Sequence, residues 1–379
     1  MVGSSQGLRL AVTGGGTGGH VLPALAVIDE LQRRGALADL IWIGSHEGVE
    51  RRAAEEAGIH FIAIPTGKLR RYFSLRNITD ATRVPFGVLA ARRALAAFRP
   101  DVVLSTGGFV SVPAVVSARG IAPVLTHEQT AILGLANRIN ARFADVLAVS
   151  YDRTEPLASR LHRRVVVTGN PIRVGLTAGE RSRGLLRFGF DAAVPTVYVT
   201  GGARGASPIN QRIEALLPGI LDRAQIVHQT GPLDANPDAA NLAQRRESLP
   251  EPVRHRYVVV EFIGDELPDV YAAAELVIGR SGAGTIAELA YVGLPAILIP
   301  LPDARGNEQA LNARVLADAG AAIVIEQPEA TPERLRTEIL ALLDDRERRT
   351  RMANAARTVA RPDAAARLAD ELLSLAGQR

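Results

Sequence analysis

The chain has 379 residues, of which 47% are hydrophobic and 22% charged, a composition typical of a globular protein and long enough for two domains. The absence of cysteine excludes disulfides and thiolate metal sites. The net charge of +4, from 44 basic and 40 acidic residues, gives no compositional sign of nucleic-acid binding, and we expect no nucleic-acid partner.

The apolar segments of the sequence predict neither secretion nor membrane insertion. The N-terminal sequence MVGSSQGLRLAV has no apolar stretch long enough for a signal peptide. The longest uncharged apolar run, LAYVGLPAILIPL at 289–301, is too short to span a bilayer and contains two prolines. We therefore expect a cytoplasmic protein.

The first element pattern is strand, glycine turn, helix. Residues 8–12 are an apolar run of strand length, 13–20 read TGGGTGGH, and apolar residues recur at helical spacing in 21–34. Glycines let the backbone adopt positive φ and approach a ligand closely. Because the unpaired N–H groups of a helix N-terminus face such a turn, the pattern favours an anion such as phosphate.

Two common phosphate-binding patterns fit this turn poorly. A Walker loop needs lysine where this chain has His20. The dinucleotide pattern G-x-G-x-x-G is present, but no acidic residue ends the next expected strand, at 40–44. The turn is therefore a phosphate-binding candidate of another kind.

Apolar runs of strand length alternate with helix-like stretches along the whole chain, and the alternation restarts after GNPIR at 169–173. This pattern predicts an α/β fold with two doubly wound, mostly parallel sheets, followed by a helical tail from about 330 that Pro362 interrupts. After 8–12, the expected strands lie at 40–44, 60–65, 101–106, 122–128, 145–150, 164–169, 195–202, 225–231, 257–263, 276–282, 295–301 and 321–327.

Glycine turns follow several of these strands, at 14–19, 107–108, 201–205 and 279–284. Ligands of open α/β sheets bind at the carboxyl ends of strands, so we expect these turns to line a cleft between the domains. Several phosphate-sized sites suggest a nucleoside diphosphate and a second phosphorylated partner.

The segment GRSGAGTIAELAYVGLP at 279–295 is the clearest candidate for the diphosphate. Backbone N–H groups of Ala283, Gly284 and Thr285 at a helix start could bind it without a metal. Glu288, one turn later, either accepts hydrogen bonds from ribose hydroxyls or simply favours the positive helix end. The sequence contains no Asp-x-Asp and no HExxH, so we expect neither a metal nor another cofactor.

His20 has two readings. Histidine suits proton transfer near neutral pH, and the positive end of a helix favours the neutral imidazole that a general base requires. Alternatively, His20 is a structural residue bonded to a neighbouring carbonyl.

The stretch 67–100 is basic and apolar, with eight basic residues and a single acid, Asp80. Such a mixture fits an anionic membrane surface, but also an ordinary solvated helix whose arginines cover apolar surface. The basic residues are Lys68, Arg70, Arg71, Arg76, Arg83, Arg92, Arg93 and Arg99.

Taken together, seven segments resemble the MurG family of peptidoglycan glycosyltransferases. They are GGTGGH (15–20), STGGFVSVP (105–113), HEQTAILGLANR (127–138), GNPIR (169–173), EFIGDELPDVY (261–271), GRSGAGTIAE (279–288) and NEQALNA (307–313). The resemblance covers roughly 8–330. It implies the GT-B fold and an inverting, metal-independent transfer of N-acetylglucosamine (GlcNAc) from UDP-GlcNAc to the MurNAc 4-hydroxyl of lipid I, which gives lipid II and UDP.

The resemblance also implies an N-terminal acceptor domain at 1–168, a UDP-GlcNAc domain at 169–361, and a helix at about 362–379 packing back on the first domain. It favours peripheral docking on the cytoplasmic face of the bacterial membrane through 67–100. The implied site residues are His20 as base; Thr17, Gly18 and Gly19 near the donor sugar and acceptor diphosphate; Arg173 and Ile263 near uracil; Ala283, Gly284 and Thr285 at the diphosphate; Glu288 on the ribose; and Gln309 on the sugar hydroxyls.

Two residues depart from the family pattern within the implied substrate site. Ala203 stands where the family usually has serine, which removes a hydroxyl that Arg204 could replace, and Thr130 stands where the family usually has asparagine. Two other functions stay open, a UDP-GlcNAc 2-epimerase and a non-catalytic scaffold of the same fold.

Overall fold

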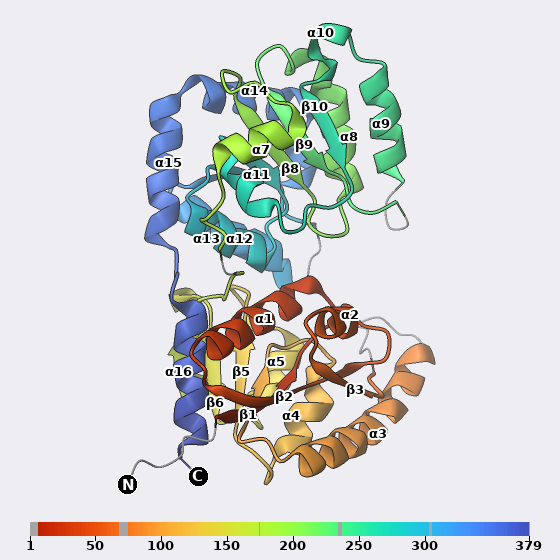
Figure 1. Ribbon diagram of the computed structural model, residues 1–379, viewed down its shortest axis with the longest axis vertical. Coiled ribbons are helices and arrows are strands. Elements are labelled where there is room, and N and C mark those ends of the chain that lie inside the picture. The colour runs from red at the N-terminus through yellow and green to blue at the C-terminus, as the bar shows by residue number, and fades with distance from the viewer. Residues whose placement is uncertain (1–6, 68–74, 174, 234–236, 303–304, 379) are drawn as a thin grey trace. The chain divides into compact units, whose positions relative to one another are not determined.

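Seven parallel strands form the sheet of the first structural unit, in the order β3-β2-β1-β4-β5-β6-β7 (Figure 1). Parallel strands require crossover connections, and helices supply most of them here, so both faces of the sheet are covered and most strand residues are apolar. The strands are β1 (Leu8–Thr13), β2 (Leu37–Ser45), β3 (His60–Ile64), β4 (Val102–Ser105), β5 (Val124–Glu128), β6 (Val146–Val149) and β7 (Val165–Val167).

The computed structural model describes residues 7–67, 75–173, 175–233, 237–302 and 305–378, with the side chains of 75–82 and of Arg305 left undescribed. The chain divides into two units, Met1–Val174 with Arg361–Arg379, and Gly175–Ala360. Each unit is described by itself.

Helices pack on both faces of the first sheet. Val27 and Leu31 of one helix join Leu368 and Leu372 of the C-terminal helix in one apolar cluster, so α1 and α16 lie side by side on one face. Leu95 and Val115 belong to the cluster on the other face. The helices are α1 (Gly18–Arg33), α2 (Val49–Glu56), α3 (Leu75–Phe98), α4 (Ser111–Ala118), α5 (Leu135–Asn140), η1 (Asp152–Thr154), α6 (Glu155–Ala158) and α16 (Ala364–Ala376).

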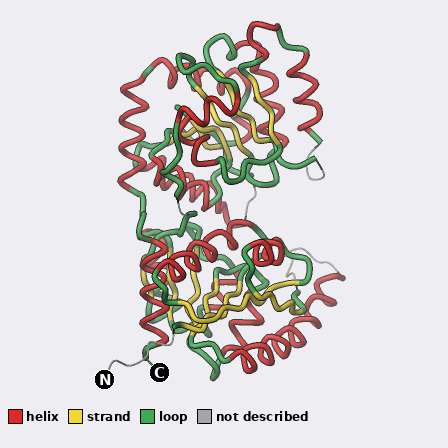
Figure 2. The backbone as a smooth tube through the Cα atoms, viewed as in Figure 1, coloured by secondary structure: helices red, strands yellow, loops and turns green. Residues whose placement is uncertain are grey.

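The second unit repeats this design around six parallel strands in the order β10-β9-β8-β11-β12-β13. Its strands are β8 (Thr196–Thr200), β9 (Gln225–Gln229), β10 (Tyr257–Val260), β11 (Leu276–Gly279), β12 (Ala296–Leu298) and β13 (Ala322–Val324). Figure 2 shows the same alternation of helices and strands in this unit as in the first.

The described helices of the second unit surround its sheet, and an apolar cluster that includes Ile213, Ile278 and Ile339 fills the space between sheet and helices. The helices are α7 (Arg181–Phe188), α8 (Ser207–Leu216), η2 (Leu217–Gly219), α9 (Asp238–Glu247), α10 (Glu251–Arg254), α11 (Leu267–Ala273), α12 (Ala283–Val292), η3 (Arg305–Asn307), α13 (Glu308–Asp318), η4 (Gln327–Glu329), α14 (Pro332–Asp344) and α15 (Arg346–Thr358).

The prediction of two doubly wound parallel sheets is confirmed. Each of the thirteen apolar runs contains a strand, and most strands are shorter than their runs. In each sheet the strand order reverses beside the first strand, at β1/β4 and at β8/β11. This reversal opens a crevice at the carboxyl ends, where doubly wound folds bind ligands.

Candidate active site

Two glycine turns meet at the reversal point of the first sheet, one after β1 and one after β4. The Gly15 N–H donates to the Gly107 carbonyl (3.3 Å), and Gly14, Gly107 and Gly108 all have positive φ. A Cβ on Gly14 would lie 2.0 Å from Thr106 Oγ1, so only glycine allows the turns to approach this closely. The two turns therefore form one rigid surface.

The carboxylate of Glu50 binds the backbone of the first turn, a role that the sequence analysis missed. This carboxylate has no exposed surface. Its Oε2 accepts a hydrogen bond from the Gly16 N–H (2.9 Å), and its Oε1 accepts from the backbone and hydroxyl of Ser45 (3.1 and 2.5 Å). A Cβ on Gly15 would lie 2.3 Å from the Glu50 carboxyl carbon. A glutamate in the first turn of α2, just after Gly48, was the available signal.

His20 lies in the first turn of α1 and is half-buried. Its Nδ1 is 2.8 Å from the Thr106 carbonyl oxygen and 3.0 Å from Gln129 Oε1. No described residue makes a hydrogen bond to Nε2. The structural reading and the general-base reading of His20 are thus compatible, because one ring nitrogen anchors the side chain and the other remains available.

Thr17, Gly18 and Gly19 surround His20 at the start of α1. Thr17 is the N-cap residue, and its side chain makes no capping hydrogen bond. Thr17 and Gly19 are exposed residues, and the first N–H groups of a helix have no partner within the helix, so this helix start can receive an anionic ligand. The structure therefore brings these three predicted residues together with His20.

Thr130 lies at the same edge of the sheet, but its hydroxyl is engaged within its own loop. The oxygen is 2.8 Å from Glu128 Oε1 and 2.6 Å from the Ile132 carbonyl. Glu128 also accepts hydrogen bonds from the Gly134 N–H and from Asn137. The contact of Thr130 with a substrate stays a prediction. Arg173 follows β7 and belongs to neither sheet.

In the second unit, the turn after β8 is held by Gln229. Its amide nitrogen donates to the Gly202 carbonyl (3.0 Å), and its oxygen accepts from the Ile263 N–H (3.0 Å). Because that N–H is occupied, Ile263 can offer a uracil only its carbonyl oxygen. Ala203 and Arg204 are exposed beside this turn.

The N-terminus of α12 carries the predicted diphosphate residues. Gly282 is the N-cap, and no side chain caps the N–H groups of Ala283, Gly284 and Thr285. Glu288, one turn later, is buried and accepts a hydrogen bond from the Tyr271 hydroxyl (2.9 Å).

Gln309, at the start of α13, lies close to this helix start. Its carbonyl oxygen accepts from the Ser281 hydroxyl (2.7 Å), and its side-chain oxygen accepts from the Leu301 N–H (3.0 Å). Its amide nitrogen therefore remains as the group that can donate to a ligand.

Arg280 places a buried positive charge behind the α12 N-terminus. It is 7% exposed, and its guanidinium donates to the Ile299 and Pro300 carbonyls (both 3.0 Å) and to Gln327 Oε1 (2.6 Å). Burial, together with nearby Arg212, lowers the pKa of Arg280 to about 10. At neutral pH it remains a cation held by neutral oxygen atoms among the described residues.

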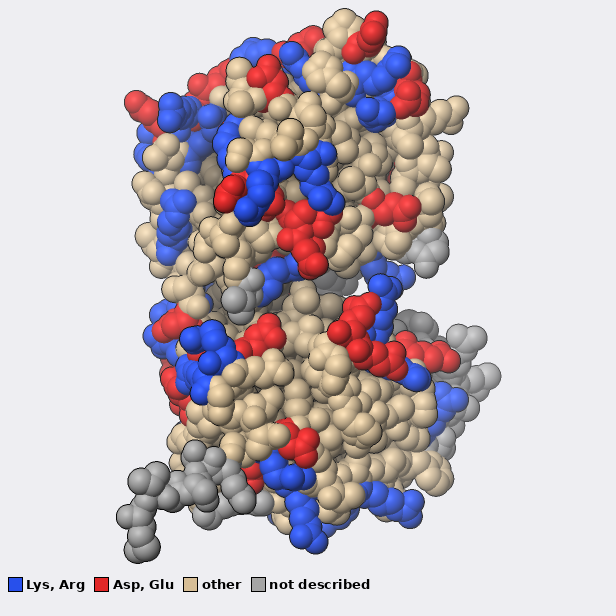
Figure 3. Space-filling model, in the orientation of Figure 1, with Lys and Arg blue, Asp and Glu red and all other residues tan. Residues whose placement is uncertain are grey.

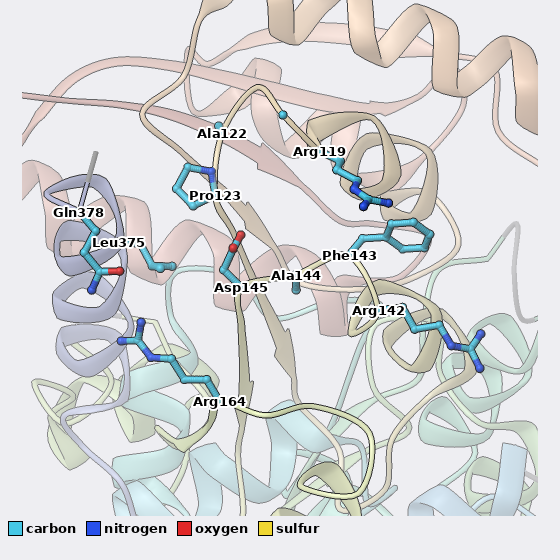
Figure 4. Close-up of a pocket in the computed structure, with 11 residues that line it drawn as sticks. Arg119, Ala122, Pro123, Arg142, Phe143, Ala144, Asp145, Arg164, Leu375 and Gln378 are labelled. Carbon is cyan, nitrogen blue, oxygen red and sulfur yellow. The ribbon is translucent and has the colours of Figure 1, made fainter.

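Apart from Arg173, the predicted residues thus form two groups, one at the carboxyl edge of each sheet. Among the described residues, no three histidine, cysteine or acidic side chains are grouped so that they could hold a metal ion. A hollow with a volume of about 690 Å³ lies elsewhere in the first unit. Figure 4 shows Arg119, Asp145 and Arg164 among the residues that line it. It lies at the amino ends of β5, β6 and β7, so it is separate from the glycine turns.

Two Rossmann-like sheets with glycine turns at their carboxyl ends define the GT-B fold, and the family models identify the chain as a glycosyltransferase of this fold. Residues 10–149 match the glycosyltransferase family 28 N-terminal domain, and 196–368 match its C-terminal domain.

Curated relatives narrow the family. The chain is 36% identical over 371 residues to the UDP-N-acetylglucosamine–N-acetylmuramyl-(pentapeptide) pyrophosphoryl-undecaprenol N-acetylglucosamine transferase of Listeria monocytogenes serovar 1/2a, covering 97% of this chain and 99% of the relative. The enzyme of the same name from Halothermothrix orenii is 36% identical over 360 residues, covering 94% and 95%. The chain belongs to the MurG family of N-acetylglucosaminyltransferases.

Solved structures agree with this assignment. The crystal structure of Acinetobacter baumannii MurG matches with a TM-score of 0.75 and 29% identity, covering 97% of this chain and 99% of that one. A putative UDP-N-acetylglucosamine 2-epimerase from Listeria monocytogenes matches with a TM-score of 0.69, 17% identity and 98% coverage of both chains. At that identity the second likeness shows a common fold only.

Three surface features bear on contact with a membrane: the length and polarity of the helices, the distribution of charge, and the exposed residues of α3. Within the described ranges, every helix is too short or too polar to cross a bilayer. On the face drawn in Figure 3, basic and acidic side chains are interspersed over both units. Of the stretch 67–100, residues 68–74 lie outside the described residues, whereas Phe86 and Leu89 of α3 are 66% and 48% exposed.

Proposed function

We propose that this protein transfers GlcNAc from UDP-GlcNAc to the 4-hydroxyl of MurNAc in undecaprenyl-diphospho-MurNAc-pentapeptide (lipid I), giving lipid II and UDP. The 36% identity to enzymes named for this transfer, over 97% of the chain, is the observation that carries the proposal. The two groups of site residues provide the groups that the reaction needs.

The second unit binds the donor in this proposal. The carbonyl of Ile263 accepts from the uracil ring, with Arg173 near the same base, and Glu288 accepts from ribose hydroxyls. Gln309 uses its amide nitrogen to orient the sugar. The turn at Ala203 lies beside the phosphates, where Arg204 supplies a cation in place of the missing serine hydroxyl.

The diphosphate is bound without a metal in this proposal. The N–H groups of Ala283 to Thr285 donate to its oxygens, and the positive end of α12 favours the negative charge. This charge grows as the sugar–phosphate bond breaks, so fixed dipoles stabilise the transition state more than the bound donor. Buried Arg280 adds a positive charge behind the same helix start.

The first unit binds the acceptor and removes its proton. Thr17, Gly18 and Gly19 approach the acceptor diphosphate and the donor sugar, while Nε2 of His20 faces the acceptor hydroxyl. The hydroxyl oxygen attacks C1 of GlcNAc as the bond from C1 to the UDP oxygen breaks, and His20 Nε2 takes the hydroxyl proton. Attack opposite the leaving group inverts the configuration at C1.

The lipid acceptor requires the enzyme to reach a membrane, and we assign this contact to α3. Ala91 and Leu95 face the core, whereas Phe86, Leu89 and Arg93 are exposed on the opposite side of the helix. Apolar side chains can enter the headgroup region, and arginine pairs with anionic lipids. The protein thus docks peripherally on the cytoplasmic face of the cell membrane.

UDP release tests the proposed reaction. Purified protein is given UDP-GlcNAc in EDTA, with and without a short-chain lipid I analogue. We expect release only with the acceptor, and no further requirement for a divalent ion. Formation of UDP and N-acetylmannosamine without acceptor would instead identify a 2-epimerase. Absence of turnover, and of UDP-GlcNAc binding by calorimetry, would identify a non-catalytic scaffold.

A further inference from the structure

Three side chains, those of His20, Gln129 and His127, are linked in a chain of hydrogen bonds, and each is buried or half-buried. Gln129, which follows β5, is 1% exposed. Its Oε1 is 3.0 Å from His20 Nδ1, and its Nε2 is 3.1 Å from Nδ1 of His127. His127 Nε2 in turn is 2.9 Å from the Gly169 carbonyl oxygen. The chain therefore links His20 to the backbone at the end of the sheet.

The surroundings of the Gln129 amide determine its orientation. Nε2 lies 2.8 Å from the Thr106 carbonyl and 3.1 Å from the His127 carbonyl. Carbonyl oxygens can only accept hydrogen bonds, so the amide nitrogen must face them. The amide oxygen is then left to face His20, and a reversed amide would bring oxygen against oxygen.

The tautomer of His20 follows from this orientation. Its Nδ1 faces two acceptors, the Thr106 carbonyl and Gln129 Oε1, at 2.8 and 3.0 Å. Nδ1 must therefore carry the hydrogen in the neutral ring, and Nε2 carries the lone pair. A general base needs that lone pair directed at the substrate.

His127 lies at the other end of this chain of hydrogen bonds, next to the Gln129 amide. It is completely buried, and this burial lowers its pKa to about 4, so the ring is neutral at pH 7. The hydrogen lies on Nε2, which donates to Gly169, and the lone pair of Nδ1 faces the Gln129 amide nitrogen at 3.1 Å. If His127 Nδ1 were protonated, its N–H would point at the N–H group of the Gln129 amide, and two donors would face each other.

Among the described residues, no carboxylate makes a hydrogen bond to the side chains of His20, Gln129 or His127. In the neighbouring turns, Glu50 accepts from Gly16 and Ser45, and Glu128 accepts from Thr130, Gly134 and Asn137. The groups that face His20 Nδ1 are therefore two neutral oxygens, the Thr106 carbonyl and Gln129 Oε1, and not a negative charge.

We propose that Gln129, held by the neutral His127, is a positioning residue that keeps the hydrogen of His20 on Nδ1 and presents Nε2 as the proton acceptor. The tautomer assignment stands on the hydrogen-bond geometry alone. Its kinetic consequence rests on the proposed function, in which His20 is the base.

The tautomers can be measured directly in the protein without substrate. Long-range ¹H–¹⁵N correlation spectra of ¹⁵N-histidine-labelled protein at pH 7.5 distinguish an Nδ1–H ring from an Nε2–H ring. We expect Nδ1–H for His20 and Nε2–H for His127. A His20 ring with the hydrogen on Nε2, or an even mixture, would overturn the proposal whatever the enzyme's activity.

The Gln129→Met variant keeps the volume of the side chain but removes both hydrogen-bonding groups. We expect the His20 resonances to shift toward a mixture of tautomers, while those of buried His228 in the other unit stay unchanged. His228 therefore serves as the internal reference. Unchanged His20 resonances in this variant would show that the Thr106 carbonyl alone selects the tautomer, and would overturn the role of Gln129.

Kinetics separates positioning from simple packing. In Gln129→Met, kcat should fall about tenfold, part of the 10²–10⁴ that a general base contributes, with KM for UDP-GlcNAc nearly unchanged. Gln129→Glu retains an acceptor for Nδ1–H, so its kcat at high pH should exceed that of Gln129→Met. Its negative charge also favours the imidazolium, so the acid limb of its kcat profile should move to higher pH. If both variants lost kcat equally and neither shifted the pH profile of kcat, the role of Gln129 would be packing alone.

Discussion

Three hydrogen bonds converge on the buried carboxylate of Glu50, and two of them come from backbone N–H groups, at Gly16 in the glycine turn and at Ser45 at the end of β2. A buried carboxylate is stable only when such bonds replace its hydration. Glu50 therefore fixes the shape of the glycine turn that presents the start of α1.

The Glu50→Gln variant tests this role. One carboxylate oxygen becomes an NH₂ group, which must face an N–H donor and leaves a buried hydrogen bond unmade. We expect the free energy of unfolding of the first unit to fall by about 1–3 kcal/mol. Urea denaturation measures it, with Glu55→Gln as control, because Glu55 pairs with Arg51 on the surface and should contribute less than about 1 kcal/mol. Equal stabilities of the two variants would contradict the bracing role.

His20→Ala tests the general base. Removing the imidazole should lower kcat for acceptor-dependent UDP release by about 10²–10⁴, because the acceptor hydroxyl then loses its proton only to water. His46→Ala is the matched control, since His46 is an exposed histidine of the same unit. Near-normal turnover by His20→Ala would remove His20 from the mechanism.

At the residue scale, the sequence identified the groups next to glycine turns but not those that support them. His20 could be predicted because a histidine directly follows Gly19 at a helix start. Gln129 lies 109 residues away from His20, and Glu50 lies 34 residues away from Gly16. Such contacts depend on which strands become neighbours, and local patterns do not determine that.

At the scale of the element, α3 has one side packed in the core and another exposed, and the exposed side is the one that we propose contacts the membrane. Its buried residues, Ala91 and Leu95, pack under the sheet, and Phe86 and Leu89 are exposed. Composition alone predicted a basic-apolar stretch. The exposed side of α3 became apparent only when the structure showed which residues pack against the core.

The double variant Phe86→Ser/Leu89→Ser tests this surface. It removes two exposed apolar side chains that make no contribution to the core, so thermal stability should be retained. Binding to vesicles that contain anionic lipids, measured by sedimentation, should weaken at least tenfold, since each buried apolar side chain contributes about 1.5–3 kcal/mol. Exposed Leu186 of the other unit gives the control, Leu186→Ser. Equal vesicle binding by the two variants would exclude α3 as the docking surface.

At the scale of the whole molecule, hydrophobic alternation was sufficient to predict both sheets. The restart of the pattern after 169–173 indicated a second sheet, and the strand order follows from right-handed parallel crossovers in a doubly wound fold. The ends of strands such as β12 and β13 were less predictable, because the apolar residues that follow them, Ile299 and Ile325, are at least as deeply buried as the strand residues.

Each unit also contains one completely buried neutral histidine, and this predicts the dependence of stability on pH. Burial lowers the pKa of His127 to about 4 and that of His228 to about 3, from 6.5. The unfolded chain therefore binds protons first as the pH falls. Above pH 6.5 neither histidine lowers the free energy of unfolding. Below pH 6.5 each lowers it by about 1.4 kcal/mol per pH unit, until the pH reaches the pKa of the folded state.

Urea unfolding at pH 7.5 and at pH 5.0 tests this expectation, with both units followed separately. Both transitions should move to lower urea at pH 5.0, before most paired carboxylates begin to protonate. In His228→Gln, which is less stable overall but lacks the titrating ring, the transition of the second unit should become less sensitive to pH while that of the first keeps its shift. If the second unit kept its full pH sensitivity in this variant, another group would have to be responsible for the acid destabilisation.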